Sequence, residues 1–196
     1  MNNSVSQELL KFLQKSPTAF HAVQQMKSEL LAVDFTELKE NQRWNIKCGK
    51  HYFVTRNDSS LIAFTIPENG IDKMHILTSH SDSPTFKIKE NPEIEVEKHY
   101  VKLNVEKYGG MLCSPWFDRP LSVAGRVIIK DKTNGQFTSK LVNIDRDLVM
   151  IPNLAIHMNR EINSGYNYNA QKDLLPLYGC GSPKGTFMEQ IAEAAG

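Results

Sequence analysis

The strongest constraint on the fold is a change in hydrophobic spacing along the chain. Over residues 9–13 and again over 20–31, apolar residues recur at intervals typical of helices. Between these runs lies Ser16-Pro17-Thr18, where proline suits a first helical turn and a hydroxyl can accept from free backbone N–H groups. This spacing predicts two helices at the start of the chain.

After residue 50 the spacing no longer fits a helix. Short runs rich in β-branched and aromatic residues follow at 52–54, 61–66 and 74–78, separated by turn-forming residues. We expect three strands here, with the last two mostly buried. Two helices followed by strands indicate that the first part of the chain mixes helical and strand structure.

From Glu93 onward apolar and polar residues alternate, which indicates strands with one face in water. Further strands are predicted at 123–129, 137–144 and 148–151, and helix formers occupy 187–195. The change from buried to half-exposed strands falls near Asn91-Pro92. We therefore predict two domains, residues 1–91 and residues 92–196.

Charge and composition exclude several classes of protein. The formal net charge is +1, from 23 basic and 22 acidic residues, so nucleic acid is not an expected partner. No apolar stretch approaches the roughly 20 residues that span a bilayer, and the N-terminus lacks the pattern of a secretory signal. The three cysteines lie far apart, which favours reduced thiols. We expect a cytoplasmic protein with no membrane partner.

The most informative polar residues are His80 and Asp82, which follow the predicted strand at 74–78. A neutral imidazole is a good zinc ligand, and a nearby carboxylate can fix its tautomer. A spacing of two leaves both side chains on the same side of an extended chain. A histidine in a loop is more often structural or solvated, so this tripeptide alone is a weak indication of a metal site.

Two other stretches contain residues that could take part in a site. Residues 107–127 include a glycine pair and the run Trp116-Phe117-Asp118-Arg119, in which the last two residues could form an ion pair. We interpret this stretch as a packed corner before a strand. His157 lies beside an apolar strip, and by itself it is better explained as a core or interface histidine. The glycine-rich segment 179–186 lacks the residue order of a phosphate-binding loop, and we exclude nucleotide binding there.

Four segments in order resemble the aspartyl aminopeptidase family of cocatalytic metallopeptidases. They are 16–23, 80–84, 108–127 and 153–160. The resemblance implies an α/β/α catalytic domain, interrupted by an inserted β-rich lid and dimerisation domain, in a large homo-oligomer built of dimers. Residues 1–91 would then be the first part of the catalytic domain, and residues 92–196 an incomplete lid. The run 116–119 argues against the related glutamyl aminopeptidases.

The same resemblance implies roles for three residues. His80 would be a metal ligand, Asp82 the carboxylate that supports it, and His157 a substrate-binding residue that acts in the active site of a partner subunit. A complete site would hold two zinc ions, with cobalt or manganese as alternatives. The family's remaining ligands and its catalytic glutamate follow the lid, so we expect them outside this chain.

These expectations lead to two hypotheses about function. The first is a metal-dependent aminopeptidase that removes N-terminal residues from peptides, with this chain as a truncated N-terminal portion that is inactive by itself. The second is a non-catalytic oligomerisation or interaction module. Metal content separates them, since an intact site would hold close to two ions per subunit.

Overall fold

The protein is described here by a computed structural model, which covers residues 4–181 and 184–196. Within it the chain forms two compact units, and the division falls between Ser83 and Pro84. Among the described residues, no helix has both the length and the apolar character needed to cross a bilayer.

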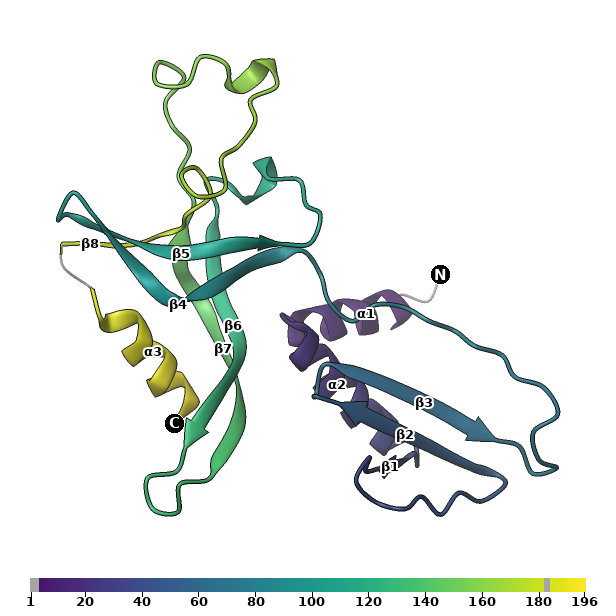
Figure 1. The fold of residues 1–196 in the computed structure, drawn as a ribbon. Helices are drawn as coiled ribbons and strands as arrows, with labels where there is room; N and C mark the ends of the chain where they lie inside the picture. The colour runs from purple at the N-terminus through teal and green to yellow at the C-terminus, as the bar shows by residue number, and fades with distance from the viewer. Residues whose placement is uncertain (1–3, 182–183) are drawn as a thin grey trace. The chain divides into compact units, whose positions relative to one another are not determined.

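The N-terminal unit combines two helices with a small sheet (Figure 1). The elements are α1 (Ser4–Lys15), α2 (Ala19–Ala32), β1 (Thr36–Leu38), β2 (Lys50–Arg56) and β3 (Ser60–Ile66). The three-stranded sheet has the order β1-β2-β3, with β1 parallel to β2 and β2 antiparallel to β3. The two predicted helices and the strands at 52–54 and 61–66 are thus confirmed.

Thr18 explains where α2 begins. Its backbone is extended, and its side-chain oxygen accepts from the backbone N–H of His21 at 3.4 Å, which satisfies one of the free donors of the first turn. The unit has a small core, made by Ala22 and Val23 of α2 and by Tyr52 and Phe53 of β2.

The predicted strand at 74–78 is wrong. This run forms no strand, and its apolar side chains lie in solvent, with Leu77 99% exposed. A strand needs a neighbour for its backbone N–H and C=O groups, and no strand of the described residues pairs with this run. The prediction that 61–66 is mostly buried is also wrong, because β3 is paired on one side only and remains largely half-buried or exposed.

The C-terminal unit is built on a five-stranded antiparallel sheet with the order β4-β5-β8-β7-β6 (Figure 1). Its strands are β4 (Thr85–Val96), β5 (Tyr100–Tyr108), β6 (Pro120–Lys130), β7 (Phe137–Met150) and β8 (Leu177–Cys180). One α-helix, α3 (Thr186–Ala195), packs on β7, and two short 3-10 helices, η1 (Ser114–Trp116) and η2 (Ile162–Ser164), lie in loops. The fold is therefore mixed α/β, as predicted.

The core of this unit follows the predicted alternation. Val101, Leu103 and Val105 of β5 are buried, and the residues between them are half-buried. The central cluster contains Leu103 and Val105 together with Val149, Leu175 and Phe187.

Two boundaries differ from the sequence prediction. Strand β4 continues through Pro92, and its pairing with β5 shifts between Ile88 and Glu93. Proline is tolerated at such an irregularity because it has no N–H to donate. The compact unit begins at Pro84, and the position predicted for the domain boundary, 91–92, lies within β4. The strands predicted at 137–144 and 148–151 are one continuous strand, β7.

Candidate functional site

The structure brings His80 and Asp82 into contact. Nδ1 of His80 lies 3.1 Å from Oδ1 of Asp82 and 2.7 Å from the backbone oxygen of the same residue. Both partners can only accept hydrogen bonds when the carboxylate is ionised, so Nδ1 carries the proton. The lone pair of Nε2 is then available to a metal, and the imidazole side chain is 81% exposed.

This pair lies in an irregular segment instead of at the end of a buried strand. Ser81, between the two residues, donates from its hydroxyl to the backbone oxygen of Ser59 at 2.9 Å. Ser59 immediately precedes β3. The sheet of the N-terminal unit thus anchors the segment through Ser81, although the strand predicted before it is not formed.

The His80–Asp82 pair provides one metal ligand but not a complete metal site. Catalytic zinc in proteins takes three protein ligands as a rule. Over the described ranges, no group of three or more His, Cys, Asp or Glu side chains is placed to hold an ion. His80, oriented by Asp82, can therefore supply one ligand, and the described residues do not complete the coordination.

His157 lies in the C-terminal unit, in a long loop between β7 and β8. We call residues 152–173 the His157 loop. The histidine occupies a turn in which the N–H groups of Met158 and Asn159 donate to the oxygen of Ala155. Its side chain is exposed, as are those of Ile156 and Met158. His157 is therefore not a core histidine of its own unit.

Asp118 holds the beginning of this loop. Its Oδ1 accepts from the backbone N–H of Asn153 at 2.9 Å, and its Oδ2 accepts from the side-chain amide of Asn153 at 2.8 Å. These two bonds, the backbone bond first, hold the pKa of the Asp118 carboxyl below its usual value. The carboxylate is thus directed to Asn153, while Arg119 donates to the oxygen of Pro115 at 3.4 Å.

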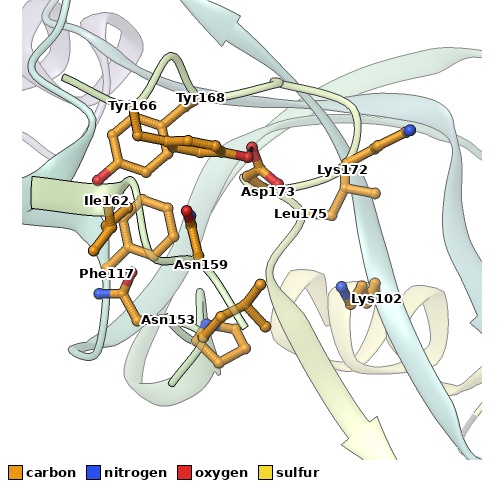
Figure 2. Close-up of a pocket in the computed structure, with 12 residues that line it drawn as sticks. Lys102, Phe117, Asn153, Asn159, Ile162, Tyr166, Tyr168, Lys172, Asp173 and Leu175 are labelled. Atoms are coloured by element: carbon orange, nitrogen blue, oxygen red, sulfur yellow. Dashed lines mark hydrogen bonds between the residues drawn. The ribbon is translucent and has the colours of Figure 1, made fainter. Parts of the chain in front are cut away.

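Aromatic residues hold the later part of the loop around a small hollow of about 110 Å³ (Figure 2). The ring of Phe117 packs on Tyr168 with centroids 5.0 Å apart, and Tyr166 meets Tyr168 edge-on. The hydroxyl of Tyr166 donates to Asp173 at 2.9 Å, and this bond raises the pKa of Tyr166. Sequence reasoning missed Tyr166, Tyr168 and Asp173, because no motif or regular spacing marks the stretch from 162 to 173.

Comparison with known proteins assigns the family. Residues 12–194 match the family model described as aminopeptidase I zinc metalloprotease (M18). The chain belongs to this family. The resemblance to the aspartyl aminopeptidases predicted from the four sequence segments is thereby confirmed at the family level.

The relatives agree with this assignment and are longer than the chain. It is 50% identical over 183 residues to the probable M18 family aminopeptidase 2 of Clostridium novyi (strain NT), an alignment that covers 91% of this chain and 42% of the relative. The chain thus spans about two-fifths of the length of that curated protein. The M18 family description names zinc, which agrees with a histidine ligand.

Solved structures of other proteins share the fold. A cryo-EM structure of the Ape4 and Nbr1 complex contains a chain with a TM-score of 0.86 and 38% identity, covering 93% of this chain and 35% of that one. The S. cerevisiae mApe1 dodecamer gives a TM-score of 0.76 at 24% identity, with 97% of this chain and 44% of that one covered. At that identity the second likeness supports the fold alone.

The segment 179–186, excluded above as a phosphate loop, is described only in part. Ser182 and Pro183 lie outside the described residues.

Proposed function

We propose that this chain supplies the N-terminal part of a metal-dependent aminopeptidase that removes N-terminal residues from peptides. Membership of the aminopeptidase I family gives the reaction class. The observation that carries the proposal to a site is the contact between His80 and Asp82, which leaves one imidazole nitrogen free for a metal.

In this proposal zinc is held in part by Nε2 of His80, while Asp82 fixes the ring through Nδ1. When bound, zinc polarises a peptide carbonyl and lowers the pKa of a water molecule. The contribution of this chain is orientation, because a ring held by a carboxylate and a backbone carbonyl presents its lone pair in a fixed direction. Two ions per complete site are proposed, and cobalt or manganese would suit the same ligand types.

We further propose that residues 1–91 begin a catalytic domain and that residues 92–196 form part of a β-rich lid and dimerisation domain. In a homo-oligomer built of dimers, His157 would contact the substrate in the partner subunit. The exposed position of His157 and of its apolar neighbours Ile156 and Met158 supports this assignment. A relative of the same fold is a dodecamer. A cytoplasmic location, also proposed, agrees with the three free cysteines.

The test measures metal content and hydrolysis of aminoacyl p-nitroanilides by the complete aminopeptidase that contains this chain. We expect His80→Ala to abolish activity and to lower the zinc content, because a ligand is removed. His75→Ala is the matched control, since His75 is an exposed histidine of the same irregular segment. Full activity in the His80→Ala protein would contradict the proposal, and a wild-type oligomer without metal or activity would favour the interaction module.

A further inference from the structure

We propose that Asp118 and Asn153 form a clamp that positions His157. This inference rests on the function proposed for His157, and it assigns to two further residues the task of holding that side chain in place. Asp118 and Asn153 are positioning residues here, since neither is required to touch the substrate.

The His157 loop has few restraints other than this clamp. It starts after Ile151, which is fully buried, and ends before Leu174, which is 1% exposed. Between these two anchors the loop contains no strand and only the short helix η2. Leu154, Ile156 and Met158, the large apolar residues nearest His157, are all exposed. Apolar packing therefore does not fix this half of the loop.

The geometry of the clamp fixes the chain at Asn153. Asp118 binds both the backbone N–H and the side-chain amide of Asn153, so the two bonds fix the direction of the backbone as well as the side chain. Asn153 precedes the Ala155–Met158 turn, which presents His157. The direction in which the chain leaves Asn153 consequently determines where this turn lies.

Asp118 is itself held in place by its backbone. Its backbone N–H donates to the oxygen of buried Ile151 at 2.9 Å, and Phe117 forms an isolated bridge with the same residue. Asp118 also has a positive φ of 54°, a conformation that Asp and Asn adopt more readily than other residues with side chains. The clamp thus connects the loop to a buried point of the sheet.

A clamp of this kind has a consequence for substrate binding. A loop that must be ordered when substrate binds loses binding free energy to conformational entropy, and a pre-ordered loop does not. A clamp that holds the loop before substrate arrives would therefore affect turnover without any direct contact with substrate.

The test uses substitutions that break the clamp and one that restores it. Asp118→Gly removes the carboxylate and keeps the positive φ accessible. Asn153→Asp replaces the amide donor with a carboxylate, which repels the carboxylate of Asp118. In the double variant Asp118→Asn/Asn153→Asp, the amide at 118 can accept the backbone N–H with its oxygen and donate its NH₂ group to the carboxylate at 153. Asp131→Gly is the control, because Asp131 is another carboxylate that binds a backbone N–H, that of Thr133, outside the loop.

The first measurement is hydrogen exchange of amides 153–159 in the 196-residue chain. We expect about 10-fold faster exchange in Asp118→Gly and in Asn153→Asp, as for the loss of a hydrogen bond, with restoration in the double variant. Asp131→Gly should leave these amides unchanged. Unchanged exchange in both single variants would overturn the clamp, whatever the activity of the enzyme.

The second measurement is kcat and KM of the complete aminopeptidase, with the oligomeric state and metal content monitored. We expect kcat to fall about 10-fold in the single variants and to recover in the double variant, with metal content unchanged. If His157→Phe impairs the enzyme while Asp118→Gly leaves kcat unchanged, the positioning role is refuted. If the wild-type enzyme lacks activity but exchange is accelerated and rescued, the proposed function fails and the clamp stands.

Discussion

At the scale of single residues, the atoms around an imidazole decide what it can do. In His21, Nδ1 lies 2.8 Å from the hydroxyl of Thr18, which can donate to it. In His80, the two oxygens near Nδ1 belong to Asp82 and can only accept. His21 is therefore suited to a helix start, whereas the arrangement of His80 leaves the lone pair of Nε2 available, as the proposed role of metal ligand requires. The sequence motif predicted the pair of His80 and Asp82, because a spacing of two acts locally.

The environment of His21 predicts a pH dependence. Burial lowers the pKa of His21 below its ordinary value of about 6.5, so the unfolded chain binds more protons than the folded chain between the two pKa values. The contribution of neutral His21 to the stability of the folded chain is complete above about pH 6.5. It is lost as pH falls through the lower pKa that His21 has in the folded chain. Hydrogen exchange in α2 should accelerate over this range. His21→Gln should weaken the pH dependence, and His75→Gln should leave it intact.

His157 gives a prediction about catalysis that depends on the proposed function. In the complete enzyme His157→Phe should lower kcat by on the order of 100-fold, since loss of a hydrogen bond to a developing oxyanion typically costs about 3 kcal/mol. Folding should hardly change, because His157 is exposed in its own unit. Steady-state kinetics and thermal unfolding measure the two effects separately, and unchanged turnover would refute the role of His157.

At the scale of elements, predictions succeeded where residues close in sequence determine the structure. They failed where contact with a distant segment of the chain determines it. Thr18 marks the start of α2, and the short turn between β2 and β3 brings adjacent strands together. The run at 74–78 has the composition of a strand, but a strand also requires a paired neighbour, which composition cannot reveal. The contact that holds the N-terminus of α3 could not be predicted from the sequence either. Glu93 accepts a hydrogen bond from the backbone N–H of Phe187, 94 residues away, at 2.8 Å.

The contact of Glu93 with α3 predicts a specific loss of stability. Its carboxylate accepts from the N–H groups of Gly185 and Phe187, and it places a negative charge at a helix N-terminus. Glu93→Gln removes the charge and one acceptor, and should lower the free energy of unfolding by about 1 kcal/mol. Urea unfolding measures this change. Glu95→Gln, on the same strand at an exposed position, should have little effect.

At the scale of the whole molecule, the two units differ in how much apolar surface they bury. The central core cluster belongs to the C-terminal unit, where residues from β5, β7, the segment before β8 and α3 meet. Among the described residues of the N-terminal unit, four apolar residues are buried. Exposed apolar residues include Val5, Leu9, Leu10 and Leu13 of α1 and those near Leu77. Domain boundaries and buried faces of this kind were predictable only roughly, because burial depends on which elements meet.

This difference predicts that the two units unfold separately. A domain's stability is a small difference between burial and conformational entropy, so a unit with few buried side chains is the weaker one. In thermal or urea unfolding of the 196-residue chain, hydrogen exchange should show α1 and α2 losing protection before β5 and β7. Leu103→Ala should lower the stability of the second transition by about 2–5 kcal/mol, because Leu103 is 1% exposed and its truncation leaves a cavity. Leu9→Ala, at an exposed position of α1, should leave that transition unchanged. A single cooperative transition, with equal protection in both units, would show that the N-terminal unit derives its stability from more than its own small core.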